Sequence, residues 1–440
     1  MTQTPILAIQ GGPPVRSTPY PIYRTIGAEE KQAVMEVMDS GVLSSFLGCW
    51  DKDFFGGYRV QKLEREWEAY FEIQHAVSFN SATSGIYAAV GACGVGPGDE
   101  VIVSPYTMTA SAAAAVVYGA IPVFADIDPD TFCLTADSIR KVISPHTKAI
   151  IVVDIFGHPA DFDSIMALAR QHGIAVIEDA AQAPGSYYHG RHGGCLADIG
   201  VFSLNYHKTI HSGEGGIAVT GDPELADRLQ LIRNHAEVVI QQRGPQPNIV
   251  NLIGQNYRMT EIEAAIASEQ LKKLEPLVMA RVAAAEYLSS QLAGLAGLDV
   301  PCVQPGVRHG WYFYVMKFDE SVTGFPRDWF VKALQAEGVP ISGGYVPPLY
   351  LQPMYQRRIG FGSNGFPWTY PGYAGSVSYE PGICPVTERM YNSQALLTDI
   401  CHANITRADL DDFVTAVKKV LLNPPLRRTE RPNPTTTVAP

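Results

Sequence analysis

The sequence predicts an α/β fold built on a mostly parallel, seven-stranded sheet with helices on both faces. Short apolar runs alternate with helical patterns from about residue 76 onward, and this alternation is typical of parallel sheets. Several runs are almost continuous in Val and Ile, as expected of strands that are buried on both faces. The candidate strands are residues 76–80, 100–106, 121–128, 148–156, 174–181, 199–204 and 216–220.

Helical patterns lie between most of these strands and continue after them. A long helical stretch covers residues 260–293 and contains Pro276, which predicts a kink or a break because proline lacks the backbone N–H. The segments 310–318, 329–337 and 408–422 then predict a smaller α+β domain. The other candidate helices are residues 84–94, 109–118, 135–143, 161–172 and 223–234.

These elements predict two domains and a tail. The large domain is expected over residues 1–275, including an N-terminal segment, and the small domain over residues 276–422. Within the small domain, residues 340–383 are rich in Gly, Pro and Tyr and predict extended loops. Residues 423–440 contain many Pro, Thr and Arg, which predicts a disordered tail.

Composition narrows the class of protein. Apolar residues make up 46% of the 440 residues and charged residues 18%, as in globular proteins with a large core. A net charge of −11 argues against nucleic acid or an anionic membrane as the main partner. The seven cysteines are scattered without any CxxC, so we expect no disulfide framework and no metal site, and a cytoplasmic location. The N-terminus shows no signal peptide pattern.

A candidate anion site follows the first strand. The run from Asn80 to Gly85 is made of small residues and leads into a helix. The N–H groups of Thr83 and Ser84 would lie at the helix N-terminus, where an anion such as phosphate is stabilised. An ordinary Ser/Thr helix cap explains the same residues.

Two ionisable residues follow other strands at the same predicted edge, where ligands bind in parallel sheets. Asp179 ends an apolar strand, so its carboxylate either stabilises the protonated nitrogen of a pyridine ring or caps the next helix. Lys208 follows the sixth strand in a loop that ends Gly-Glu-Gly-Gly. It is either a Schiff-base former or a solvated surface lysine. Together, the phosphate loop, the acid and the lysine favour a cofactor site.

Four segments make the sequence similar to a known family. They are Phe202-Ser203-Leu204-Asn205-Tyr206-His207-Lys208 with Gly213-Glu214-Gly215-Gly216 after it, Glu178-Asp179-Ala180-Ala181-Gln182, Pro105-Tyr106-Thr107, and Gly254-Gln255-Asn256-Tyr257-Arg258-Met259. With them, the chain resembles the DegT/StrS-type enzymes, which use pyridoxal 5'-phosphate (PLP) and belong to fold type I of the aspartate aminotransferase superfamily. The resemblance covers roughly residues 11–422.

The resemblance implies a role for each matching residue. Lys208 would hold PLP as a Schiff base and move the proton, and Asp179 would pair with the pyridinium nitrogen. Gln182 would bond the ring hydroxyl, and Tyr106 would stack on the ring. The phosphate would be held by Thr83, the Ser84 N–H, Ser203 and Asn256. Because Asn256 is expected from the other subunit, the resemblance implies a homodimer with shared active sites.

The implied activity is transfer of an amino group from Glu or Gln to a ketone on a sugar, a cyclitol or a related secondary-metabolite precursor. Two alternatives remain open: a PLP-dependent dehydratase or other lyase on a similar substrate, and a non-catalytic regulatory member of the fold. Dehydratases of this type carry histidine in place of the lysine. The five-residue step from Ser203 favours Lys208 over His207 as the catalytic position.

Two aromatic loops, residues 48–57 and 340–383, depart from the compact nucleotide-sugar type of the family. We expect a compact polyhydroxylated ketone as substrate, because aromatic faces suit the C–H faces of a sugar or cyclitol ring. The alternative is that these aromatic residues only pack the small domain or an interface. The candidates are Trp50, Phe54, Phe55, Tyr345, Tyr350, Trp368 and Tyr370.

Overall fold

The computed structural model describes residues 6–243 and 248–425. Most of the predicted tail, from residue 426 onward, lies outside this range. The predicted large sheet is present, with the order β1 (His75–Phe79), β9 (Gly216–Thr220), β8 (Ile199–Ser203), β5 (Ala175–Asp179), β4 (Thr147–Val153), β2 (Glu100–Val103) and β3 (Ile121–Phe124). Strand β9 runs antiparallel to both of its neighbours, and the other pairs are parallel. The predicted fold class and all seven strands are confirmed.

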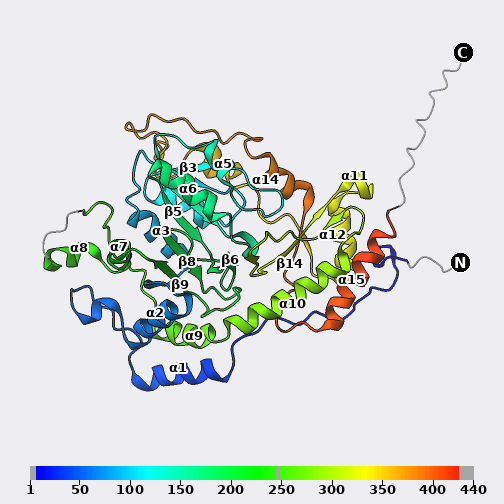
Figure 1. Ribbon diagram of the computed structural model, residues 1–440, viewed down its shortest axis with the longest axis horizontal. Coiled ribbons are helices and arrows are strands. Elements are labelled where there is room, and N and C mark those ends of the chain that lie inside the picture. Colours follow the sequence, from blue (N-terminus) through cyan, green and yellow to red (C-terminus); the bar gives the residue numbers. More distant parts are fainter. Residues whose placement is uncertain (1–5, 244–247, 426–440) are drawn as a thin grey trace, which may run out of the picture.

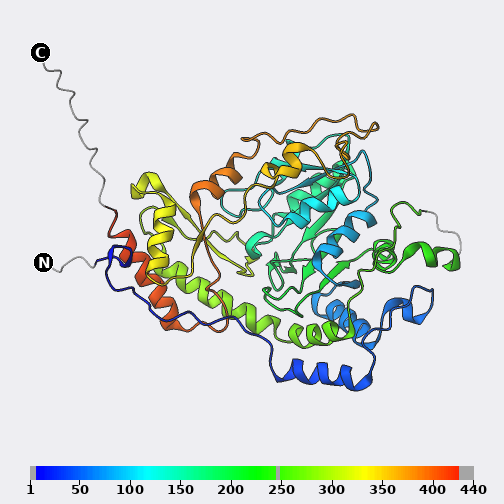
Figure 2. The same ribbon diagram turned by 180° about the vertical axis from the view of Figure 1, so that it is seen from behind.

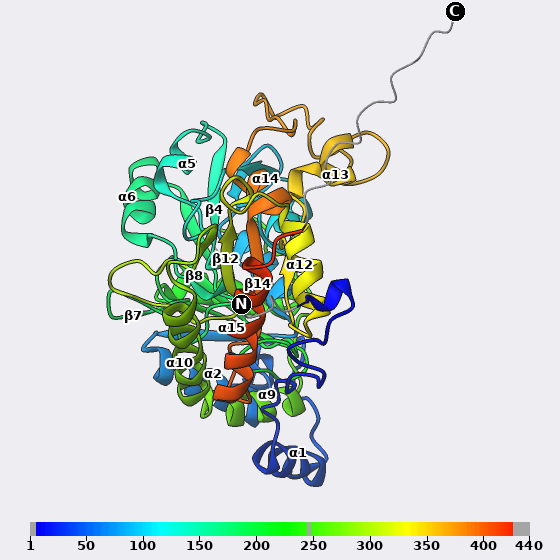
Figure 3. The ribbon, with the colours of Figure 1, turned by 90° about the vertical axis from the view of Figure 1, so that its right-hand side faces the viewer.

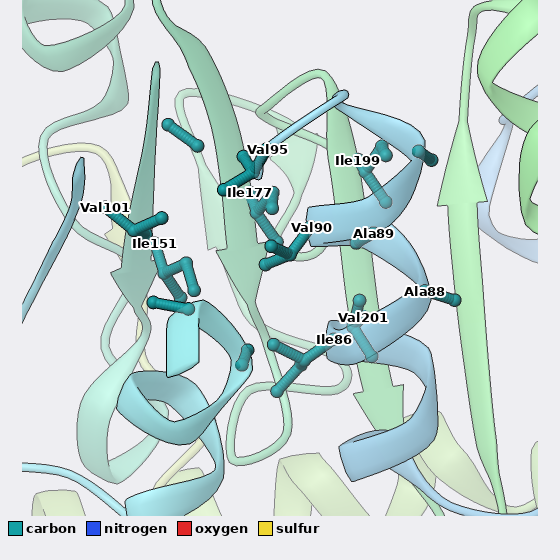
Figure 4. Close-up of a cluster of buried hydrophobic side chains, with 14 of the residues drawn as sticks. Ile86, Ala88, Ala89, Val90, Val95, Val101, Ile151, Ile177, Ile199 and Val201 are labelled. Atoms are coloured by element: carbon teal, nitrogen blue, oxygen red, sulfur yellow. The ribbon is translucent and has the colours of Figure 1, made fainter. Parts of the chain in front are cut away.

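Helices cover both faces of this sheet (Figure 1). Three of them, α3 (Ala82–Ala92), α4 (Thr109–Val117) and α7 (Pro223–Arg233), pack on one face. Figure 4 shows strand side chains such as Ile151, Ile177 and Val201 gathered with side chains of α3. The opposite face carries α2 (Tyr58–Phe71), α5 (Ala136–Arg140), α6 (Phe162–His172) and α9 (Glu261–Leu271).

The long helical stretch is broken between α9 and α10 (Leu274–Leu292). Pro276 lies in the first turn of α10, where a missing N–H leaves no helical bond unmade. Helix α10 leads into the small domain, whose antiparallel sheet has the order β10 (Leu298–Asp299), β12 (Tyr314–Phe318), β14 (Ala395–Thr398) and β13 (Ser342–Gly343). Figure 3 views this domain from its outer side, with α12 (Arg327–Ala336) and α15 (Arg407–Leu421) beside β12 and β14.

Shorter elements complete the described chain. A three-stranded sheet joins β11 (Val307–Arg308), β6 (Tyr187–Tyr188) and β7 (Arg191–His192). The remaining helices are α1 (Ala28–Ser40), α8 (Ala236–Val239), α11 (Glu320–Thr323), α13 (Pro353–Arg357) and α14 (Pro385–Arg389). None of the described helices is both long and apolar enough to cross a membrane.

The N-terminal segment packs on the small domain before it reaches α1 (Figure 2). The Glu337 carboxylate accepts the backbone N–H of Ala8 and of Val15, at 2.9 and 3.0 Å. Arg16 forms an ion pair with Asp409 of α15 at 2.7 Å. The first described residues are therefore attached to the small domain, although they precede the large domain in sequence. The predicted division at residue 275 stays a prediction.

The segment 353–383 returns from the small domain to the edge of the large sheet. The Tyr379 hydroxyl donates to the Pro122 carbonyl of β3 at 2.7 Å, and the Trp368 indole N–H donates to the Tyr379 hydroxyl at 2.8 Å. The Tyr373 hydroxyl donates to Glu100 of β2 at 2.6 Å. These bonds hold the long segment against β2 and β3.

Candidate active site

Lys208 is buried in the loop that follows β8, with only 9% of its surface exposed. The loop is closed by backbone bonds from Leu204 to Gly215 and from Ser212 to Leu204, at 2.9 and 3.0 Å. The Lys208 Nζ lies 4.5 Å from the ring centroid of Tyr312. Burial lowers the pKa of Lys208 to about 8, and the negative charge of Asp179 partly opposes this shift. A neutral, nucleophilic amine is therefore accessible near neutral pH.

Asp179 is the last residue of β5 and is 4% exposed. Its carboxylate accepts the Ser111 hydroxyl of α4 at 2.7 Å and the Ala181 N–H at 3.2 Å. Burial raises its pKa, while the Ser111 and Ala181 bonds and the charge of Lys208 lower it. No helix begins directly after β5, so Asp179 caps none. Among the described residues the carboxylate has no cation within ion-pair distance, which suits a positively charged ligand group.

Gln182 and Tyr106 are both linked to the small domain through Tyr345. The Gln182 side chain accepts the Phe156 N–H at 2.6 Å and donates to the Tyr345 hydroxyl at 3.1 Å. The Tyr345 backbone N–H donates to the Tyr106 hydroxyl at 3.0 Å. Tyr106 is fully buried, and its ring lies 6.3 Å from Phe132. Its present contacts are those of a core residue, and stacking on a cofactor ring stays a prediction.

The candidate phosphate loop forms the start of α3. The hydroxyl of the N-cap residue Ser81 accepts the Ser84 N–H at 3.1 Å, so this N–H takes part in an ordinary helix cap. The Ser84 hydroxyl donates to Asn80 at 2.6 Å, and Thr83 is exposed in the first turn. Gly216 of β9 lies against this turn, because a Cβ there would be 2.5 Å from the backbone nitrogen of Ala82. The approach is close enough to require glycine.

Ser203 brings the lysine loop to the same edge, because it pairs in register with Gly216. It is buried and accepts the Asn205 N–H at 3.3 Å. Asn256 is exposed instead, and its side chain accepts the Arg258 Nε–H at 2.8 Å. The structure thus brings Ser203, at the end of the strand that leads to the lysine loop, close to the start of α3, and leaves Asn256 at the surface.

These residues fit PLP by their chemistry. A helix N-terminus with hydroxyls nearby suits the phosphate, an unpaired buried carboxylate suits a protonated ring nitrogen, and a buried amine of low pKa suits the aldehyde. His207 lies beside Lys208 but is exposed. Partial desolvation of its ring and the neighbouring Lys208 charge lower the pKa of His207. Of the two neighbours, the buried amine suits covalent attachment of an aldehyde better than the exposed imidazole.

A cleft of about 1070 Å³ opens beside the lysine loop. Its walls come from three parts of the chain: the N-terminal segment, the lysine loop and the small domain. The residues that line it include Tyr23, His207, Arg281, Tyr312, Asp399 and His402.

Most of the predicted substrate aromatics pack elsewhere. The Trp50 ring packs tilted against Phe54 and edge-on against Phe55, with centroids 5.2 and 5.5 Å away. Tyr350 and Trp368 belong to the core cluster of the large domain. Of the predicted set, Tyr345 lines the cleft. For Trp50, Tyr350 and Trp368, the packing alternative describes the observed contacts.

Sequence reasoning missed three neighbours of the site. Ser111 lies in an alanine-rich helix and resembles a packing residue, although its hydroxyl orients Asp179. Tyr23 precedes the motif segments and Tyr312 follows them, each by more than fifty residues. No local pattern marks them, because their placement depends on the docking of the small domain.

Comparison with known proteins gives a consistent result. The model of the DegT/DnrJ/EryC1/StrS aminotransferase family matches residues 24–418. The spore coat polysaccharide biosynthesis protein SpsC of Bacillus subtilis is 35% identical, covering 78% of this chain and 86% of the relative. The L-glutamine:2-deoxy-scyllo-inosose aminotransferase of Streptomyces kanamyceticus is 33% identical, covering 95% and 97%.

Solved structures are similar as well. The aminotransferase from Psychrobacter cryohalolentis superimposes with a TM-score of 0.78 at 27% identity, covering 92% of this chain and 99% of that chain. DesV of S. venezuelae superimposes with a TM-score of 0.74 at 31% identity, covering 89% and 94%. The likeness therefore extends over both domains.

Proposed function

We propose that this chain, which belongs to the DegT/DnrJ/EryC1/StrS aminotransferase family, moves an amino group from glutamate or glutamine to a ketone on a sugar or cyclitol ring. It is a PLP-dependent aminotransferase. The observation that carries the proposal is the buried amine of Lys208 at one sheet edge with the buried, unpaired carboxylate of Asp179. The substrate class rests on relatives named for 2-deoxy-scyllo-inosose and for GDP-perosamine.

When bound, PLP supplies an electron-poor ring that stabilises negative charge on the substrate. Lys208 would hold the cofactor through Nζ and afterwards carry a proton to and from the substrate carbon. Asp179, oriented by Ser111, would keep a proton on the ring nitrogen. Gln182 would bond the ring hydroxyl. Thr83, Ser84 and Ser203 would hold the phosphate.

The cleft supports a polar, ring-shaped acceptor. Its volume of about 1070 Å³ is ample for a sugar or cyclitol. Tyrosine side chains line it, and tyrosine offers both an apolar face and a hydroxyl. The buried Lys208 beside an exposed His207 favours amino transfer over the dehydratase alternative, in which histidine takes the place of the lysine.

We further propose a homodimer with shared active sites, located in the cytoplasm. Helix α1 and the segment after it expose Met35, Met38, Val42, Leu43 and Leu47, each by 45–55%. A cluster of exposed apolar side chains supports an interface with a second copy. Asn256 is exposed on the subunit, which leaves it available to a partner's site. All seven cysteines are free, which supports a reducing compartment.

The test is a screen of the two half-reactions. The PLP form is mixed with Glu, Gln or Ala, and the aminated form is then mixed with nucleotide-linked keto sugars or free inosose-type ketones, with the amine product followed by mass. Borohydride reduction of the resting enzyme should attach the cofactor to the peptide that carries Lys208. Attachment at another lysine, or no donor consumed, would contradict the proposal.

A further inference from the structure

Asp154 and Glu178 are two buried carboxyl groups that the proposed mechanism does not use. Asp154 directly follows β4, and Glu178 lies in β5 opposite Val152. Side chains two residues apart along a strand lie on the same face, so Asp154 and Glu178 share one side of the sheet. Both are 0% exposed, and their carboxyl groups are close enough to hydrogen-bond with each other. Two groups of like charge therefore meet in the interior.

The hydrogen bonds around the pair distinguish its two members. The Glu178 carboxylate accepts the Gly194 N–H on Oε1 at 2.5 Å and the Leu196 N–H on Oε2 at 2.7 Å. The Asp154 Oδ1 accepts the Ala160 N–H at 3.2 Å, whereas its Oδ2 is buried and accepts no hydrogen bond from a described residue. Donors at both oxygens stabilise the charged form of a carboxyl group. Glu178 is therefore suited to carry the charge, and the Asp154 Oδ2 is suited to carry a hydrogen.

The surroundings of the pair offer no compensating charge. Within residues 6–243 and 248–425, neither carboxyl group has a Lys, Arg or His nitrogen within 4.0 Å. The titratable groups that face the pair are Asp179, Cys133 and Cys195. Burial raises the pKa of both thiols, so they stay neutral, and Asp179 adds a further like charge. Two unpaired carboxylates at this position would repel each other at high cost, which one proton removes.

The pKa values of the two groups agree with this geometry. Burial, followed by the charge of Glu178, raises the pKa of Asp154 well above its ordinary value. Burial also raises the pKa of Glu178, but the bond from Asp154 and the N–H groups of Gly194 and Leu196 oppose that shift.

We infer that Asp154 and Glu178 share one proton, which Asp154 donates from Oδ2 to the Glu178 carboxylate, and that this pair positions Asp179. A hydrogen bond from an acid to a carboxylate is short and strong. It ties the carboxyl end of β4 to β5, where the Asp154 backbone N–H donates to the Asp179 carbonyl at 3.1 Å. The shared proton also leaves Asp179 beside one negative charge instead of two. This proton is a property of the fold, and only its effect through Asp179 rests on the proposed function.

Two isosteric variants of the holoenzyme locate the proton. Asp154→Asn can still donate to Glu178, so its thermal midpoint at neutral pH should stay near that of wild type. Glu178→Gln turns an amide N–H toward the N–H of Gly194 or Leu196, which leaves both donors unsatisfied, so its thermal midpoint should fall by several degrees. Equal stability of the two variants, or the reverse order, would overturn the assignment.

The pH dependence gives a second measurement. Because the pKa of Asp154 is raised above 3.8 on folding, the folded wild type holds a proton that the unfolded chain releases, and its stability falls as pH rises. Relative to Asp154→Asn, its unfolding constant should rise by up to about tenfold per pH unit. The thermal midpoint of Asp154→Asn should therefore gain on that of wild type between about pH 5 and about pH 9. A constant difference would contradict the shared proton.

Infrared spectroscopy at neutral pH detects the proton directly. The difference between wild type and Asp154→Asn should show the C=O band of a protonated carboxylic acid. Asp161→Asn is the matched control, because hydrogen bonds from Ser164 and Tyr188 lower the pKa of Asp161 although partial burial opposes them. Its difference spectrum should show carboxylate bands instead. Carboxylate bands in both spectra would overturn the inference.

The positioning role is tested by deletion and rescue. Asp154→Ala removes the donor, so the half-reaction with glutamate should slow by about 10-fold. It should also shift the pH midpoint of the cofactor absorbance, and Asp154→Asn should restore both. An unchanged half-reaction and midpoint in Asp154→Ala would refute the role through Asp179. If wild type consumes no donor while the infrared and stability results stand, only the proposed function fails.

Discussion

Asp179→Asn is the substitution that tests the chemistry of the site most directly. The amide has nearly the shape of the carboxylate, and it can still accept the Ala181 N–H that now lies 3.2 Å away. It removes the negative charge that would keep a proton on the ring nitrogen of PLP. We expect the fold and cofactor binding to persist and the proton-transfer step to slow.

The size of the effect follows from the burial of Asp179. The carboxylate is 4% exposed and has no ion-pair partner among the described residues, so solvent does little to replace its charge. With PLP bound, the Asp179 carboxylate and the protonated ring nitrogen would form a buried pair. Removing one partner of a buried pair costs about 3 kcal/mol or more. Since each 1.36 kcal/mol is tenfold in rate, the half-reaction with glutamate should slow by roughly 150-fold or more.

The assay is a single-turnover reaction with saturating glutamate, followed through the absorbance of the cofactor. Ser111→Ala is the matched control, because it removes the 2.7 Å hydrogen bond but keeps the charge. A hydrogen bond to a charged group contributes about 1.5 kcal/mol, so this variant should lose only about 10-fold. Full turnover in Asp179→Asn, or a larger loss in Ser111→Ala, would refute the electrostatic role of Asp179.

Four further predictions rest on the same geometry. Reconstitution of apoenzyme with PLP should accelerate as pH rises through about 8, because the protonated Lys208 amine cannot attack the aldehyde. A midpoint of this pH dependence near the ordinary lysine pKa of 10.5 would show an exposed amine. Mixing inactive Lys208→Ala and Asn256→Ala chains should restore part of the activity, since one site of each heterodimer then carries neither lesion; no recovery despite proven subunit exchange would exclude shared sites. Trp368→Ala should lower the thermal midpoint and affect both half-reactions alike, because Trp368 packs against the large domain. Tyr345→Phe should slow one half-reaction more than the other with little change in thermal midpoint, because it removes only the bond to Gln182. If Tyr345→Phe lowered the thermal midpoint and Trp368→Ala slowed one half-reaction selectively, Trp368 would be the site residue and Tyr345 the structural one.

The large sheet could be predicted because its strands are short Val and Ile runs buried on both faces. The errors lie at the carboxyl ends of the strands. The run 100–106 was expected to be a strand, but β2 ends at Val103, and Pro105 beyond it has no N–H to donate to a neighbouring strand. The run 121–128 likewise stops at Phe124, and Asp126 leaves the sheet to accept the N–H groups of Val386 and Thr387.

The motif residues of the site could be found because they follow successive strands, and strand order brings them to one edge. Tertiary contacts decide the rest. The Ser84 N–H bonds Ser81 of the same turn, and its contact with a phosphate stays a prediction. Tyr106 has aromatic neighbours on its ring, and its stacking on a cofactor likewise stays a prediction. Local sequence does not determine these contacts, because they depend on which residues the folded chain places beside each group.

The cleft beside Lys208 depends on docking of the N-terminal segment as much as on the motifs. Glu337 of the small domain accepts the N–H of Ala8 and Val15, and these bonds hold the chain so that Tyr23 reaches Thr209 and covers Arg281. Because Tyr23 contacts the lysine loop on one side and α10 on the other, any movement of the small domain relative to the sheet must strain or break its contacts. The position of the small domain and the geometry of the amine are therefore coupled through a segment that carries no recognisable motif.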